Sequence, residues 1–195
     1  MLVTWDVDGL FTSIVHKDGL QNLQDLLEEN KQNKIPSHYI MKLMEIILHN
    51  NIFTFHDPDW KQEIGAAMGS RPIPSYANNC MAKSIDPFIK ELAKQYNKEA
   101  YDSLQLLKRF LDDYFSIFNG TSKMLHLLWD QMNKIHPSIK LTMSHTSGLE
   151  EDPNEKCECE ELHATPFLDT LCSIKDGRIE TDLYCKKRTL TNIYS

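Results

Sequence analysis

Two adjacent acidic residues stand out in a run that is otherwise apolar and aromatic. Asp112 and Asp113 interrupt the stretch RFLDDYFSIF, residues 109–118, which we expect to be buried. Paired carboxylates are costly to bury unless something compensates their charge. Asp6, in the stretch TWDVDGLFTSI, ends the first expected strand in a similar apolar context. Two strand ends that brought Asp6 beside Asp112 would create a site for divalent cations.

The chemistry of such a site would be that of Mg²⁺, which binds carboxylate oxygens together with water and substrate phosphates. Two such ions about 3.5–4 Å apart can activate a 3′-hydroxyl for attack and stabilise the leaving pyrophosphate. They would also relieve the repulsion between clustered acids. The alternative is an ordinary turn, because Asp side chains readily bond to their own backbone there. The acidic pair alone leaves both interpretations open.

The elements that must position these acids alternate irregularly between helix and strand. Apolar spacing predicts helices at 18–31, 37–50, 77–96 (bent at Pro87) and 122–135. Strand-like runs lie at 2–11 (broken at Gly9), 51–55, 104–118 (a hairpin that turns at the Asp pair), 139–144 and 165–185 (two strands joined at Asp176-Gly177). Residues 65–76 hold two glycines and two prolines and should be irregular. This order predicts an α+β fold, an antiparallel sheet with helices packed on one face.

The composition is that of an ordinary folded domain, with 41% apolar and 25% charged residues. We find no signal peptide and no apolar stretch near the roughly 20 residues of a membrane span, so no membrane partner is expected. Five scattered cysteines favour reduced thiols in an intracellular protein. The net charge of −7 comes mostly from residues 150–161, which hold seven acids and one lysine. A nearly neutral remainder permits a polynucleotide partner.

Four blocks of the sequence occur in the order seen in reverse transcriptases: WDVDGLFTSI, AAMGSRPIPSYANN, RFLDDYFSIF and PFLDTLCSIKDGRIETDLYCKK. The detail resembles the Penelope-like retroelement branch, and the resemblance extends from about Thr4 to the C-terminus. It implies the palm of a right-hand polymerase, acting as an RNA-directed DNA polymerase with Mg²⁺ or Mn²⁺. The implied partners are an RNA template with a DNA primer, and a dNTP. The nucleus would be a natural location, although no basic import signal is evident.

The resemblance assigns roles to individual residues. Asp6 and Asp112 match the metal ligands of the family, and Asp113 matches the less direct neighbour in the catalytic set. Phe11 matches the aromatic steric gate, which contacts the sugar and excludes a 2′-hydroxyl. Without the motif, plain core packing would be the better interpretation of Phe11. Asp8 is interpreted as a turn residue.

A second set of residues matches the family block that supports template and nucleotide: Gln62, Gly65, Met68, Gly69 and Pro72. Glycines there would let a backbone approach a base pair closely. The alternative is a simple Gly/Pro connector.

Basic residues are candidates for phosphate or proton-transfer contacts. Lys140 matches a lysine thought to assist proton transfer to pyrophosphate, and Arg71, Lys186 and Lys187 could contact phosphates. Each could equally be a solvated surface group. Cys157, Cys159 and His163 invite a zinc interpretation, but they lack the second ligand pair that makes such a site convincing.

The expected organisation is a palm core at 1–149, an acidic loop at 150–163, and at 164–195 a palm hairpin that leads toward a thumb. Fingers, a full thumb and an endonuclease are expected to be missing. The alternative to an enzyme is therefore an inactive retroelement remnant, or a co-opted module that binds nucleic acid or protein.

Overall fold

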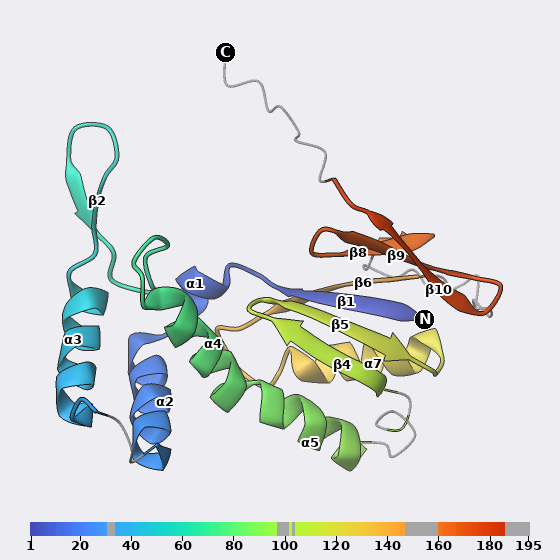
Figure 1. Cartoon of the computed structure of the whole chain (residues 1–195), viewed down its shortest axis with the longest axis horizontal. Helices are drawn as coiled ribbons and strands as arrows, with labels where there is room; N and C mark the ends of the chain where they lie inside the picture. Colours follow the sequence, from blue (N-terminus) through green and yellow to red (C-terminus); the bar gives the residue numbers. More distant parts are fainter. Residues whose placement is uncertain (31–33, 97–101, 103, 147–159, 186–195) are drawn as a thin grey trace.

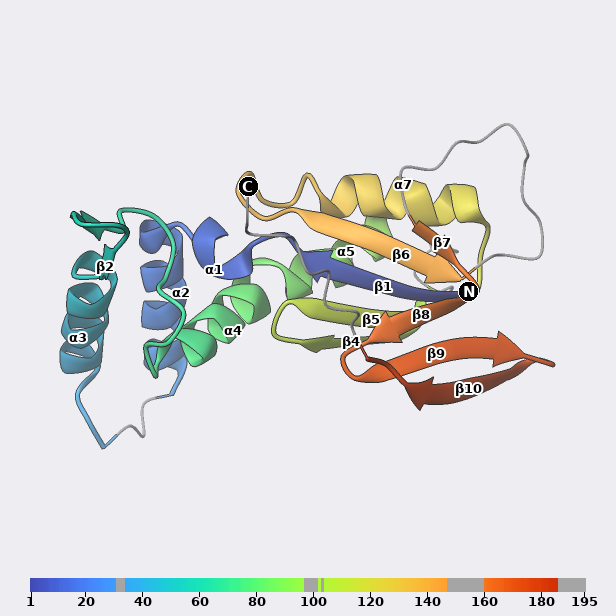
Figure 2. The ribbon, with the colours of Figure 1, turned by 90° about the horizontal axis from the view of Figure 1, so that it is seen from above.

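The computed structural model describes residues 1–30, 34–96, 102, 104–146 and 160–185. Its central element is a five-stranded sheet in the order β4-β5-β1-β6-β7 (Figures 1 and 2). The strands are β4 (Leu104–Phe110), β5 (Asp113–Phe118), β1 (Leu2–Val7), β6 (Leu141–Thr146) and β7 (Glu160–Leu162). Neighbouring strands are antiparallel except β6 and β7, which are parallel.

Two helices cover one face of this sheet, α5 (Asp86–Tyr96) and α7 (Ser122–Met132) (Figure 1). The alternation along β1 explains this, since Val3, Trp5 and Val7 are buried on that face. The predicted α+β class, with helices on one face of an antiparallel sheet, is confirmed.

A second, three-stranded sheet lies on the other face. Its strands are β8 (Ala164–Phe167), β9 (Thr170–Lys175) and β10 (Arg178–Leu183). The hydroxyls of Thr4 and Thr165 are 2.9 Å apart, and the rings of Phe115 and Phe167 have centroids 5.2 Å apart. The β8 strand therefore covers only part of this face.

The remaining elements form a group beside the sheet: α1 (Leu10–Ser13), α2 (His16–Glu29), α3 (Ser37–His49), β2 (Ile52–Thr54), β3 (Asp59–Lys61) and α4 (Ile73–Ser84). Helix α2 packs between α3 and α4. Its contact with α4 is close, because a Cβ atom built on Gly19 would lie 1.9 Å from the Tyr76 hydroxyl. The β2–β3 hairpin projects from this group (Figure 1). No helix in the described ranges is both long enough and apolar enough to cross a membrane.

Several sequence predictions need correction. The helix expected at 77–96 is two helices, broken at Ile85, and α4 already begins at Ile73, inside the stretch expected to be irregular. The strand β3 was not predicted. Residues 165–185 form parts of three strands rather than two, because Leu168 and Asp169 make an additional turn.

Candidate active site

The three predicted acidic residues lie on neighbouring strands, where β1 ends beside the β4–β5 hairpin. In the register of β1 with β5, Asp6 lies directly opposite Asp113. The Val7 amide donates a hydrogen bond of 3.2 Å to the Asp112 carbonyl. Opposed residues of antiparallel strands point to the same face, with Cβ atoms about 4.5–5.5 Å apart. The structure thus brings Asp6, Asp112 and Asp113 together, while their metal-binding role stays a prediction.

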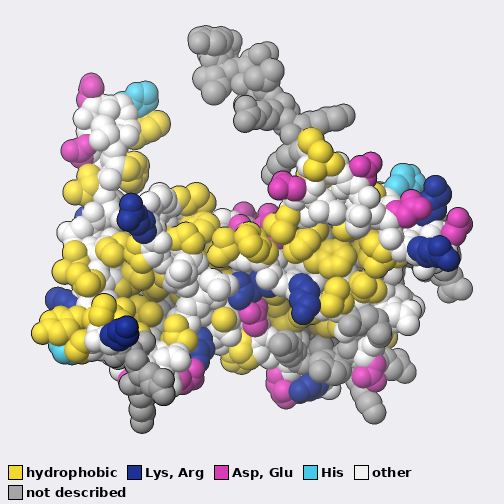
Figure 3. Space-filling model, in the orientation of Figure 1, with side chains coloured by type: hydrophobic (Ala, Val, Ile, Leu, Met, Phe, Trp, Pro, Cys, Tyr) yellow, Lys and Arg dark blue, Asp and Glu magenta, His cyan; other side chains and the backbone are white. Residues whose placement is uncertain are grey.

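These acids lie on the face of the sheet opposite α5 and α7. Asp6 alternates with the buried Trp5 and Val7 and is itself exposed. It shares its face with Thr4, which contacts β8, so the acids lie beyond the part that β8 covers. In Figure 3 the molecule has an open notch between the β2–β3 side and the β8–β10 side, with acidic side chains at its floor. Ligands in solution can reach this end of the sheet.

The turn that carries Asp112 is strained. Leu111 and Asp112 alone connect β4 to β5, and Leu111 has a φ of 54°. A side chain at positive φ costs about 1–2 kcal/mol, which is why glycine is usual at such positions. The chain contains a second turn of this kind on the other sheet, Leu168-Asp169, in which Leu168 has a φ of 55°.

Phe11 and Gly65 also lie together. The Ala66 amide donates to the Phe11 carbonyl at 2.6 Å, and a Cβ atom on Gly65 would lie 2.6 Å from the same oxygen. The Gly65 carbonyl in turn lies 2.6 Å from Nε2 of His16. Phe11 is half-buried and packs against the core. Only glycine permits this close approach, because its φ of +78° and the contact distance both disfavour a side chain.

Other predicted residues have mixed surroundings. Gln62 donates through Nε2 to the Ile64 carbonyl at 2.9 Å. Met68 is 74% exposed, and nothing lies within 4 Å of a Cβ atom built on Gly69. Arg71 is exposed and has no hydrogen bond or ion pair within the described part of the chain. Within the described residues, no hydrogen bond or ion pair joins Met68, Gly69 or Arg71 to the three acidic residues.

Lys140 stands next to β6 at the same end of the sheet as Asp6. Its carbonyl accepts a 2.8 Å hydrogen bond from the Asp8 amide, which agrees with Asp8 being a turn residue. Its ammonium donates to the Asn133 carbonyl at 2.7 Å. Lys186 and Lys187 fall outside the described residues, as do Cys157 and Cys159 of the zinc hypothesis.

The carboxylates fit a metal that is shared with a substrate. Among the described residues, no three His, Cys, Asp or Glu side chains gather closely enough to hold a metal ion by themselves. Mg²⁺ usually binds through one or two carboxylates and completes its shell with water and phosphates. Asp6 and Asp112 offer that donor set, so the residues present suit Mg²⁺ bound together with a phosphate-bearing ligand.

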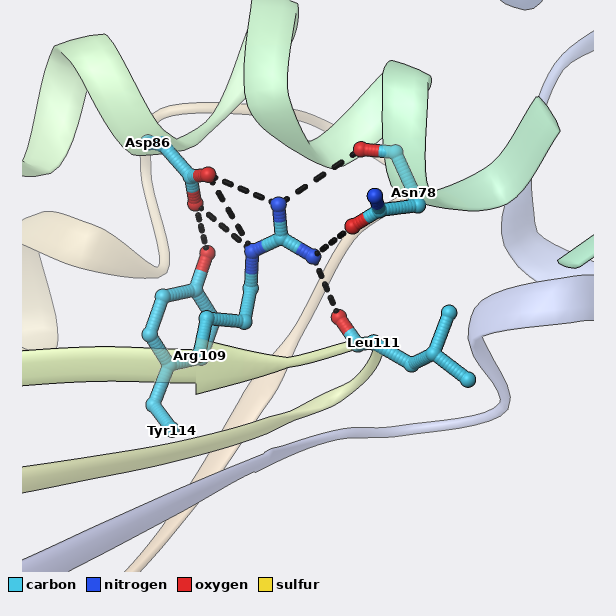
Figure 4. Close-up of polar contacts among 5 residues, drawn as sticks. All are labelled: Asn78, Asp86, Arg109, Leu111 and Tyr114. Atoms are coloured by element: carbon cyan, nitrogen blue, oxygen red, sulfur yellow. Dashed lines mark hydrogen bonds and ion pairs between the residues drawn. The ribbon is translucent and has the colours of Figure 1, made fainter. Parts of the chain in front are cut away.

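Sequence reasoning missed a set of polar residues behind the turn: Asn78, Asp86, Arg109 and Tyr114 (Figure 4). The Tyr114 hydroxyl donates to Asp86 at 2.6 Å, and Arg109 pairs with the same carboxylate. Burial opposes the charge of Arg109, but hydrogen bonding and attraction to Asp86 outweigh it and raise its pKa. Burial, with the nearby Asp86 charge, raises the pKa of Tyr114. An arginine three residues before Asp112 was the available signal.

Comparison with known proteins shows the fold. No family model matches the chain, and no curated protein matches it by sequence. Among solved structures, it is similar to an apo telomerase from Candida tropicalis, truncated from its C-terminal domain, with a TM-score of 0.58 and 10% identity. The match covers 93% of this chain, and the chain spans 35% of that telomerase. The chain therefore has a fold similar to that of this telomerase.

Proposed function

We propose that the chain is the palm region of an RNA-directed DNA polymerase, which adds deoxynucleotides to the 3′-hydroxyl of a primer. The observation that carries this proposal is the β1–β5 register, which places Asp6 opposite Asp113 and next to the Asp112 turn. The telomerase-like fold supports it. The ordered motifs that resemble Penelope-like elements favour a retroelement enzyme.

Asp6 and Asp112 would hold Mg²⁺ or Mn²⁺ between them. When bound, the metal would activate the primer hydroxyl and stabilise the departing pyrophosphate. The chain itself contributes two carboxylates at the open end of a sheet, with Asp113 as a third negative charge beside them. A cation bound between Asp6 and Asp112 would offset the negative charge that these neighbouring acids bring to one end of the sheet.

Phe11 would contact the sugar of the incoming dNTP. Its carbonyl accepts a hydrogen bond from the Ala66 amide and its side chain packs against the core, so we expect the ring to be held in place. A rigid aromatic ring at that position would exclude a 2′-hydroxyl and select deoxynucleotides. The exposed part of the same loop would extend the nucleotide surface through Gln62, Met68 and Gly69.

The proposed partners are an RNA template and a DNA primer, both of which carry phosphates. Basic side chains would contact them outside the acidic floor of the notch. We assign this role to Arg71, Lys186 and Lys187. Lys140, at the same sheet end as Asp6, would donate a proton to pyrophosphate, for which its ammonium must leave the Asn133 carbonyl.

A primer-extension assay tests the proposal. The 195-residue chain is incubated with poly(rA)/oligo(dT), dTTP and Mg²⁺ or Mn²⁺. We expect metal-dependent incorporation that falls to background in Asp112→Asn and in Asp6→Asn. Asp169→Asn is the matched control, because Asp169 has the same place in the second Leu-Asp turn and lies on the other sheet. This variant should keep full activity.

Incorporation that Asp112→Asn leaves unchanged would contradict the assignment of the metal ligands. A wild-type chain that incorporates nothing with either metal would favour the alternative, a non-enzymatic retroelement remnant or interaction module.

A further inference from the structure

Arg109 connects two helices to the turn that carries Asp112 (Figure 4). Its Nη1 donates to the Leu111 carbonyl and to Asn78 Oδ1, each at 2.8 Å. Its Nε and Nη2 donate to the two oxygens of Asp86, at 2.9 and 2.7 Å. One guanidinium thus joins α4, α5 and the hairpin turn.

The guanidinium is itself held firmly. Its side chain is only 10% exposed, and the two-point contact with Asp86 is the geometry in which Arg–carboxylate bonds are strongest. Asp86 is fixed further by the Tyr114 hydroxyl at 2.6 Å. Because both partners of Arg109 are anchored, its hydrogen bond to Leu111 acts on the turn from a rigid support.

The turn needs such support. A backbone held at positive φ with a leucine side chain persists only where its surroundings fix it. Arg109 holds the Leu111 carbonyl from the helix side, and the Val7 amide holds the Asp112 carbonyl from β1. Loss of either contact would let the turn relax and move the side chain of Asp112.

We infer that Arg109 is a positioning residue that holds the Leu111-Asp112 turn against β1 and so sets the position of the Asp112 carboxylate. The meaning of that position for metal binding rests on the proposed function. The hold on the turn does not, so the two can be tested separately.

The first measurement is amide hydrogen exchange of Val7 without metal, in the wild-type chain and in Arg109→Gln. Losing a hydrogen bond from a charged donor should speed this exchange about tenfold or more. The Tyr184 amide is the internal reference, because it donates at 2.8 Å to the Asp169 carbonyl of the second turn and should not change. Lys108→Gln is the matched control, since Lys108 neighbours Arg109 on β4 and its side chain makes no hydrogen bond or ion pair within the described residues.

The second measurement is Mn²⁺ affinity, followed by the loss of the free-ion EPR signal. Arg109→Gln should weaken binding about tenfold, by the same estimate, and Lys108→Gln should not. Adding Leu111→Gly to Arg109→Gln should restore most of the affinity, because glycine adopts a φ near 54° without steric cost. Arg109→Lys keeps the positive charge but loses the two-point contact with Asp86, so its Mn²⁺ affinity should be intermediate. This variant replaces Arg109→Gln in both measurements if Arg109→Gln does not fold.

Unchanged Val7 exchange in folded Arg109→Gln or Arg109→Lys would overturn the inference. Faster Val7 exchange with unchanged Mn²⁺ affinity would also overturn it, because the position of the Asp112 carboxylate would then not depend on Arg109. A wild-type chain that binds no Mn²⁺, but whose Val7 exchange responds as expected, would contradict the proposed metal site and support the hold on the turn.

Discussion

The close contact of Gly65 with the backbone of α1 can be tested by a single substitution. We predict that Gly65→Ala destabilises the fold strongly, because a Cβ atom there would lie 2.6 Å from both the Phe11 carbonyl oxygen and the Thr12 Cα. Those neighbours are backbone atoms, which cannot move aside as the end of a flexible side chain can. The backbone of Phe11 would have to shift instead.

The magnitude has two parts. An alanine at a φ of +78° costs about 1–2 kcal/mol from backbone strain alone. Forcing a methyl group into occupied space typically costs a further 1–3 kcal/mol or so. The chain supplies a control for the first part, since Gly177 has a φ of +73° and nothing within 4 Å of a built Cβ. Gly177→Ala should therefore show the strain without the clash.

The assay is urea unfolding of both variants and of the wild-type chain, with the unfolding free energy taken from linear extrapolation. Gly65→Ala should lose about 1–3 kcal/mol more than Gly177→Ala, by the overpacking cost just given. Equal losses in the two variants would show that the loop yields freely. The close contact would then not fix Phe11, and the argument for a rigid sugar contact would fail.

Three further predictions concern the core. Gly19→Ala should destabilise despite its better helix propensity, because the new Cβ would meet both the hydroxyl and the ring Cζ of Tyr76. Adding Tyr76→Phe, which removes only the hydroxyl, should recover part of the loss in urea unfolding, and a Gly19→Ala variant as stable as the wild type would refute the clash. The raised pKa of Tyr114 means that its stabilising contribution is present below roughly pH 10 and lost above it. Tyr114→Phe should therefore lose less unfolding free energy than wild type between about pH 9 and 11, measured in urea at each pH. Burial raises the pKa of Cys80 to about 12, so iodoacetamide at about pH 8 should label the exposed Cys185 far faster, as peptide mass mapping can show.

The features that the sequence predicted well have local signals. The turn at Asp176-Gly177 is one, and both residues have positive φ, 49° and 73°, as a two-residue hairpin of this type requires. The hairpin at Asp112 is another, because two β-like runs meet there. The helices α2 and α3 follow from apolar spacing, and their ends lie within two residues of the predicted ones.

The convergence of Asp6 with Asp112 has no local signal. It depends on β1 lying between β5 and β6, an order of strands that no pattern within either segment encodes. The resemblance to reverse transcriptases suggested it, and the register shows the proximity without showing the role. The turn at Leu168-Asp169 was missed because its local sequence is misleading. Leu168 lies at positive φ, where glycine is the usual residue.

Two failures of the sequence analysis have one cause: the prediction of a single helix at 77–96, and the failure to find the polar contacts of Arg109. Periodicity alone joins α4 and α5 into a bent helix, with Asp86 as an ordinary surface acid. In the structure the helix ends at Ser84, and Asp86 becomes the first residue of α5, where a negative charge suits the helix dipole and Pro87 loses no hydrogen bond. From that position its carboxylate meets Arg109 and Tyr114. The break between α4 and α5, which sequence patterns do not reveal, therefore places Asp86 where it can anchor Arg109. The geometry of the Leu111-Asp112 turn thus depends on where these two helices are divided, although both are far from Asp112 in the sequence.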